Sequence, residues 1–240
     1  MLLFFCFGFS SPHSSIIARK KLGGGGNCVA GTTFSYNGNH PSGTNYACDS
    51  DSAALEGTVT GATVTSSYIT SAAADERVAW TIDTTEFNDE QGTLCFSFNI
   101  QTAWGTDGLI EIWYDASNYI KIYSNDGGDV LVALHSGAGT ESAINSGAGS
   151  PDTWYRACYT WQTAADTGGK HNISLAACSG ANCSGIVQSW VGEATEDLDV
   201  WGTNTTVLIA GELNAERTQP DDPLIADITI TSGYQDADPF

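Results

Sequence analysis

Hydrophobic and polar residues alternate with a period of two along most of the chain. Val78, Trp80 and Ile82 alternate with polar or small residues, and the run from Leu94 to Ile100 does the same. This period places every second side chain on the same face of a β-strand. No window has the periodicity of an amphipathic helix. Further strand-like runs occupy residues 119–123, 130–134, 153–161, 172–177, 186–191, 205–213 and 224–231.

Turn-forming residues separate these runs. Asn125-Asp-Gly-Gly lies between two alternating runs, and Pro220-Asp-Asp-Pro precedes the last one. Asp-Gly in such a position is a strong hairpin signal, because type I′ turns need positive φ. About eleven short strands with frequent turns predict an all-β fold, a two-sheet antiparallel sandwich or jelly roll.

The charge excludes several classes of function. The chain has 240 residues, 28 of them acidic and 8 basic, and a net charge of −20. Such a chain repels phosphate backbones, so we expect no nucleic-acid partner. No apolar run reaches the length of a membrane-spanning helix, so no membrane span is predicted. Seven Trp, nine Tyr and nine Phe argue against disorder.

The first 26 residues differ from the rest. They contain no acidic residue, an apolar run at 2–9, the basic cluster 19–21 and four glycines at 23–26. One interpretation is a secretory leader. The other is a retained N-terminal arm on a four-glycine hinge, through which the chain could form a homo-oligomer. Both leave residues 27–240 as a single β-sandwich domain.

Six of the seven cysteines can form three disulfides. Cys28 and Cys48 bracket a loop with little apolar content, and the segment Cys178–Cys183 is short and rich in turn formers. Cys95 and Cys158 lie in strand-like runs, where they either pair across a sheet, which we favour, or remain buried free thiols. Three disulfides predict an extracellular or surface-exposed protein, whereas free cysteines would fit a reducing cell.

The order of several segments along the chain resembles that of a known protein superfamily. The stretch 92–135 is followed by TWYRACYTW at 153–161, AGELNAE at 210–216 and ADITITSGY at 226–234. In this order the segments resemble the laminin-G-like / concanavalin A-like lectin and glucanase superfamily over residues 55–235. The resemblance implies a concanavalin A-like jelly roll, here with an extended N-terminal arm.

The superfamily includes glycan hydrolases and lyases, whose catalytic motifs are missing here. Hydrolases of the laminarinase type carry Glu-x-Asp-x-Glu on one strand, and the alginate-lyase type uses an Arg-rich strand with Gln-x-His. The nearest candidate for such a pair, Glu111 and Asp115, is four residues apart, which is about 13 Å along a strand. Two carboxyl groups acting on one glycosidic bond must lie closer. We therefore predict a protein that is not an enzyme.

A structural Ca²⁺ is the one cofactor that the resemblance suggests. Ca²⁺ prefers six to eight oxygen ligands. Asp49 and Asp51 in the N-terminal loop are candidates, and the resemblance adds Asp227 in the final strand. Ala226, Ile228 and Ile230 are predicted to face the core, so Asp227 is expected on the other face.

Tryptophans are candidates for a sugar platform, because the ring packs on C–H groups and its N–H donates. Trp80 and Trp154 lie inside alternating apolar runs and are predicted to be core residues. The candidates for ligand binding are Trp104 in a glycine-rich loop, Trp113 on the same side as Glu111, Tyr114, and Trp201 after an acidic loop.

These features predict a non-catalytic extracellular recognition domain, with a glycan or a cell-surface molecule as its partner in carbohydrate binding or adhesion. The alternative is a structural subunit of a virion or extracellular assembly, which the basic, glycine-hinged arm would suit. A glycan-degrading enzyme is the third possibility.

Overall fold

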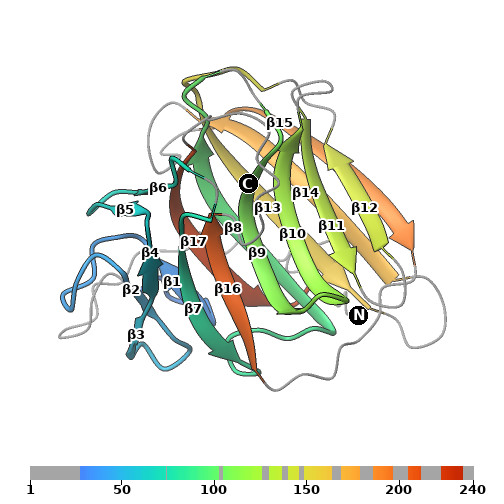
Figure 1. Cartoon of the computed structure of the whole chain (residues 1–240). Helices are drawn as coiled ribbons and strands as arrows, with labels where there is room; N and C mark the ends of the chain where they lie inside the picture. Colours follow the sequence, from blue (N-terminus) through green and yellow to red (C-terminus); the bar gives the residue numbers. More distant parts are fainter. Residues whose placement is uncertain are drawn as a thin grey trace, which may run out of the picture.

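The chain folds as an all-β sandwich of two antiparallel sheets, which confirms the predicted fold class (Figure 1). The computed structural model describes residues 28–73, 75–102, 105–125, 130–136, 140–145, 149–163, 169–178, 186–196, 205–211 and 223–234. Over these residues it contains seventeen strands, six of them short strands before residue 71 that the periodicity did not predict. No helix in the described part of the chain is long and apolar enough to span a membrane.

The larger sheet has ten strands and lies at the back in Figure 1. Eight of them follow the order β15-β14-β13-β8-β17-β1-β2-β3, while β6 pairs with both β17 and β5. Their bounds are β1 Phe34–Tyr36, β2 Tyr46–Cys48, β3 Ala54–Glu56, β5 Thr63–Val64, β6 Ile69–Thr70, β8 Gln91–Asn99, β13 Trp154–Gln162, β14 Gly169–Cys178, β15 Ile186–Glu196 and β17 Leu224–Ser232.

The smaller sheet has seven strands in the order β12-β11-β10-β9-β16-β7-β4 and faces the viewer in Figure 1. Its strands are β4 Thr58–Thr60, β7 Arg77–Asp83, β9 Asp107–Asp115, β10 Asn118–Asn125, β11 Val130–Ser136, β12 Thr140–Asn145 and β16 Thr205–Gly211.

The hydrophobic core lies between the sheets and follows the predicted alternation. Trp80 of β7 is fully buried there, as predicted, beside Phe96, Phe98 and Trp161. The prediction for Trp154 is wrong. In β13 the core side chains are Tyr155, Ala157, Tyr159 and Trp161, so Trp154 points to the opposite face and is partly exposed.

Two of the predicted disulfides are present, Cys28–Cys48 and Cys95–Cys158. Cys95 of β8 and Cys158 of β13 lie directly opposite each other in the ladder, so their side chains share one face of the sheet. Cys178, at the end of β14, is also disulfide-bonded. Its predicted partner Cys183 lies outside the described residues, as do residues 1–26.

A β-bulge interrupts β17 around Asp227, which has a φ of 48°. The partly buried Arg156 guanidinium donates to the Asp227 carbonyl oxygen at 2.6 Å and to Thr229 Oγ1 at 3.1 Å. Burial lowers the pKa of Arg156 to about 10, and the Asp227 carboxylate opposes that shift. Arg156 therefore stays charged at neutral pH and satisfies the carbonyl that the bulge removes from the ladder.

Candidate functional site

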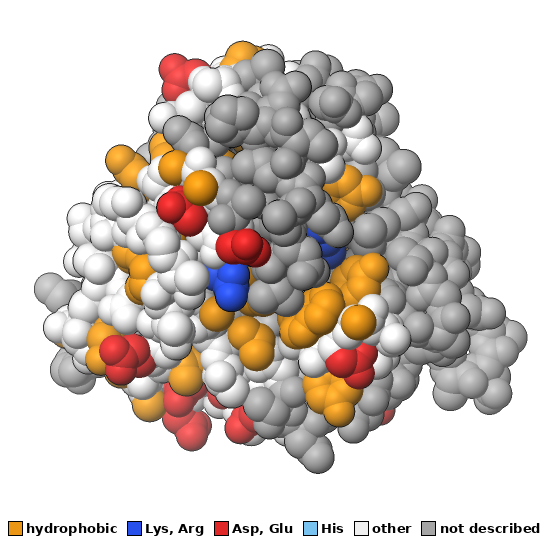
Figure 2. All heavy atoms as spheres, viewed as in Figure 1, with side chains coloured by type: hydrophobic (Ala, Val, Ile, Leu, Met, Phe, Trp, Pro, Cys, Tyr) orange, Lys and Arg blue, Asp and Glu red, His pale blue; other side chains and the backbone are white. Residues whose placement is uncertain are grey.

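The β9–β10 hairpin presents an aromatic surface on the outer face of the seven-stranded sheet. Ile110 and Ile112 of β9 are buried in the core between the sheets. Because strand side chains alternate, Glu111 and Trp113 point to the outer face, as the sequence predicted for Trp113. Figure 2 shows this face, with hydrophobic side chains gathered near the turn that joins β9 to β10.

Trp113 is paired with Tyr119 of β10 across the ladder. Their ring centroids are 5.7 Å apart and the ring planes are 17° from parallel. Both side chains are partly exposed. The two nearly parallel rings, held by adjacent strands, form a stacked, partly exposed aromatic pair whose indole N–H and phenol O–H are polar.

An ion pair lies next to these rings on the same face. Lys121 Nζ is 3.8 Å from Glu111 Oε1, and the two side chains are 7% and 2% exposed. The same ammonium lies 5.7 Å from the centroid of the Tyr123 ring. Glu111 is thus buried and neutralised by Lys121, which is a structural arrangement rather than that of a free catalytic carboxylate.

Tyr114 lies at a β-bulge, so alternation along the strand does not define the face of the sheet to which it points. Asp115 pairs with Asn118 and Trp113 with Tyr119, so Tyr114 is the extra residue of a β-bulge. Its side chain is 47% exposed, and it is one of the large hydrophobic residues that the described part of the chain leaves exposed. Trp104 and Trp201, the other two predicted platform residues, lie outside the described residues.

A separate acidic cavity of about 430 Å³ lies beside the short N-terminal strands. The predicted calcium ligands Asp49 and Asp51 line it. Asp83, which ends β7, and Glu86, which follows that strand, line it as well, although neither was among the predicted site residues.

The carboxylates of this cavity already accept hydrogen bonds from the protein. Asp49 Oδ1 accepts from the amides of Asp51 and Ala53, at 3.0 and 2.7 Å. Asp83 Oδ1 accepts from the Thr85 hydroxyl and amide, each at 2.7 Å, and these bonds lower the pKa of the Asp83 carboxyl group.

Asp227 is not among the residues that line this cavity. It interacts instead with Arg156, whose positive charge disfavours a cation at that carboxylate. The three predicted calcium ligands are therefore not brought together. Calcium binding stays a prediction for Asp49 and Asp51 alone, which a rise in melting temperature on adding Ca²⁺, lost in Asp49→Asn, would support.

Two aromatic residues of this surface, Tyr119 and Tyr123, were not among the predicted site residues. Tyr119 and Tyr123 alternate with Ile120 and Ile122 in a recognisable strand, so their outward direction could have been inferred. Their position beside Trp113 depends on the register of the hairpin and its bulge, which alternation does not give.

No protein-family model matches the chain, and no curated protein matches its sequence. Solved structures do match its fold. The binding domain of botulinum neurotoxin DC in complex with SialylT matches at 12% identity and a TM-score of 0.56, covering 86% of this chain and 48% of that chain. Trypanosoma rangeli sialidase matches at 12% identity and a TM-score of 0.52, covering 87% of this chain and 31% of that chain.

The binding domain of botulinum neurotoxin DC in complex with rat synaptotagmin II matches at 11% identity and a TM-score of 0.53, with 86% of this chain and 49% of that chain covered. The chain spans about half the length of these toxin chains and about a third of the sialidase. Identity this low shows the fold alone, a jelly-roll-like sandwich.

Proposed function

We propose that the protein is an extracellular recognition domain that binds a glycan on the outer face of its seven-stranded sheet. The stacked pair of Trp113 and Tyr119 is the observation that carries the proposal. Flat, partly exposed rings offer an apolar surface to the C–H groups of a sugar ring, while the indole N–H and phenol O–H can bind its hydroxyls. Two disulfides support a location in an oxidising compartment.

The fold supports a binding role without specifying one. A toxin domain with the same fold is described in complex with SialylT, and another with a protein, synaptotagmin II. A sialidase also shares the fold, so catalysis is not excluded by architecture. We favour binding because Glu111 is engaged by Lys121 and because Asp115 Oδ1 accepts from the Ser117 amide at 2.8 Å within the hairpin turn.

The charge of the chain favours a neutral glycan over an acidic one. The net charge of −20 repels polyanions at long range. Lys121, on the same face as the aromatic pair, is already neutralised by Glu111. Uncharged hexose chains meet neither obstacle, so their binding should depend little on salt.

Trp113→Ala is expected to weaken glycan binding by at least about tenfold, and Tyr119→Ala to weaken it similarly, because aromatic residues dominate binding energies. The protein would first be screened on an array of neutral and acidic glycans with millimolar Ca²⁺, and the affinity for a bound glycan then measured by calorimetry.

Trp154→Ala is the matched control, since this Trp is partly exposed on the other sheet. It should leave the affinity unchanged. An array without binders, or equal affinities for Trp113→Ala and the unsubstituted protein, would contradict the proposal. Release of reducing ends from any polysaccharide would show an enzyme instead.

A further inference from the structure

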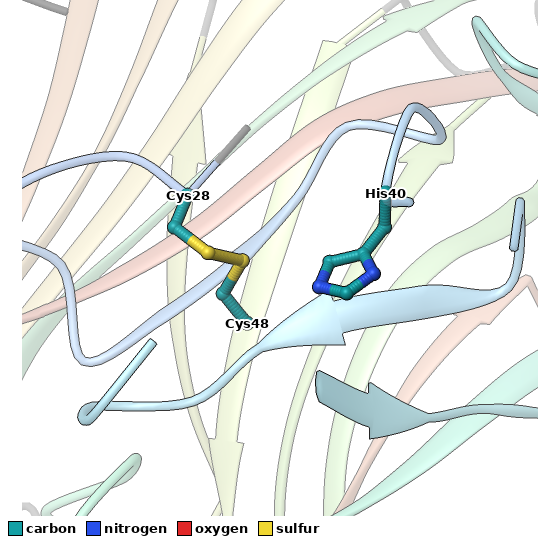
Figure 3. Close-up of side chains that lie close together, drawn as sticks. All are labelled: Cys28, His40 and Cys48. Carbon is teal, nitrogen blue, oxygen red and sulfur yellow. A yellow bond between two sulfur atoms is a disulfide. The ribbon is translucent and has the colours of Figure 1, made fainter. Parts of the chain in front are cut away.

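Three side chains that can ligate a metal meet at the N-terminal edge of the sandwich. Cys28, His40 and Cys48 are the one such group of three in the described part of the chain whose ligand atoms all lie within 4.8 Å of one another. Figure 3 shows the His40 ring directed toward the disulfide that joins the two cysteines. The glycan-binding proposal does not use this group.

Contacts other than the disulfide hold the three residues in place. Cys48 ends β2 and pairs with Ser35 of β1 and with Ala54 of β3. The residue after Cys28, Val29, donates its amide to Ser35 Oγ at 3.2 Å. The strand pairing of Cys48 and the hydrogen bond of Val29 therefore keep both cysteines beside β1 when the disulfide is opened.

His40 is held by its own turn. The Gly43 amide donates to the His40 carbonyl oxygen at 3.0 Å. The ring stacks on Tyr46, with centroids 5.8 Å apart and planes 24° from parallel. The histidine thus keeps its place beside the two sulfurs whether or not they are bonded to each other.

The hydrogen bond from Ser42 defines the neutral tautomer of the His40 ring. The Ser42 amide donates to His40 Nδ1 at 3.1 Å, so that nitrogen carries a lone pair and Nε2 carries the proton of the neutral ring. Metal binding at Nε2 moves the ring proton to Nδ1 and breaks the hydrogen bond from the Ser42 amide.

We propose that Cys28, His40 and Cys48 form a binding site for a soft divalent metal such as Zn²⁺ when the disulfide is reduced. Two thiolates and one imidazole are a known ligand set for Zn²⁺, with a fourth position open to water. A disulfide sulfur is a poor ligand, so metal and disulfide are alternatives at this site.

A dithiol reductant can convert the Cys28–Cys48 disulfide into the two thiols that bind the metal. The dithiol gives two electrons and two protons to the Cys28–Cys48 bond and becomes a disulfide, leaving two thiols on the protein. Zn²⁺ then displaces the two thiol protons to solvent, and the two thiolates neutralise its charge. In either state a covalent or coordinate link joins residue 28 to β2.

Cobalt is the spectroscopic probe for this site, because Co²⁺ reports thiolate ligands and tetrahedral geometry by its absorption. The full chain, reduced under nitrogen with a phosphine, should take up one Co²⁺ with a thiolate charge-transfer band. Zn²⁺ should displace the cobalt and protect two thiols from alkylation. The oxidised protein should show no such band.

His40→Gln should weaken metal binding by at least about tenfold, since loss of an outer partner alone costs that much at zinc sites. Cys28→Ser should abolish the band, and Asp83→Asn, in the acidic cavity, should leave it unchanged. Failure of the reduced protein to bind Co²⁺, or the same affinity in His40→Gln, would overturn the proposal.

Production in a reducing cytosol with added zinc gives a test that does not depend on reducing the folded protein. The purified chain should contain one zinc by elemental analysis, and His40→Gln should contain less. A zinc-free chain with unmodified Cys28 and Cys48 thiols would refute the site. None of these results bears on the glycan proposal, which depends on Trp113 and Tyr119.

Discussion

Trp80→Ala is expected to lower the free energy of unfolding by about 3–5 kcal/mol. Trp80 is fully buried, and its ring centroid lies 4.9 Å from that of Tyr36 and 5.6 Å from that of Phe34. Its Nε1 also donates to the Asn45 carbonyl oxygen at 3.1 Å. The substitution opens a large cavity between the sheets and removes one of the two hydrogen bonds that the Asn45 carbonyl oxygen accepts, the other coming from the Gly57 amide. Urea unfolding followed by fluorescence and circular dichroism measures the loss.

Gly57 provides an internal check, because a Cβ at this position would lie 2.6 Å from Trp80 Nε1 and 2.8 Å from Val78 Cγ1. Gly57→Ala should therefore cost about 1–3 kcal/mol. That cost should fall in a Trp80→Phe background, where the indole nitrogen is gone, although the contact with Val78 remains. Costs that simply add in the double variant would show that Trp80 does not pack on Gly57.

Period-two alternation was sufficient to predict the sandwich and much of its core. Val78, Trp80 and Ile82 lie between the sheets, as do Leu94, Phe96, Phe98 and Ile100. These side chains are large and their strands are regular, so burial and alternation agree. The same logic placed Trp113 on the outer face, opposite Ile110 and Ile112.

Irregular backbone limited the prediction elsewhere. The bulge at Asp227 shifts the alternation of β17, so Ile225 joins Ile228 and Ile230 in the core, where strict alternation selects Ala226. The bulge at Tyr114 likewise decides which residue of β10 meets Trp113. An inserted residue changes the face of everything beyond it, and nothing in the composition of these segments marks it.

Sequence patterns could not predict contacts between distant segments of the chain. The cavity joins Asp49 and Asp51 to Asp83 and Glu86 only because β2 and β7 belong to facing sheets. The approach of His40 to the Cys28–Cys48 disulfide depends on the turn at Gly43. Spacing in the chain carries no information about either meeting.

The protein should also become less stable as the pH falls, because of one buried histidine. His171 of β14 is fully buried, and burial lowers its pKa from 6.5 to about 4. One ring nitrogen, Nδ1, lies 3.0 Å from the Tyr159 hydroxyl. The other, Nε2, has no hydrogen-bond partner in the part of the chain that the structure describes. An imidazolium would need an acceptor at both nitrogens, so the folded state resists the proton.

The direction of this pH dependence follows from the pKa values of His171 in the unfolded and the folded chain. Between pH 6.5 and about 4 the unfolded chain binds this proton and the folded chain does not, so the free energy of unfolding decreases as the pH falls. Across the whole window the loss attributable to His171 is about 3 kcal/mol. Above pH 6.5 both states hold the neutral ring, and the contribution is constant.

His171→Gln isolates this effect, because its amide can donate to or accept from the Tyr159 hydroxyl while the side chain no longer titrates. Urea unfolding at intervals from pH 7.5 to 4 should give a steeper decline for the unsubstituted protein than for His171→Gln. His40→Gln is the matched control, since it also removes an imidazole, but from a partly exposed position. Carboxylates titrate in all three proteins and cancel in the comparison. Parallel curves for the unsubstituted protein and His171→Gln would mean that the sandwich admits a charged His171, with water reaching Nε2 from outside the core.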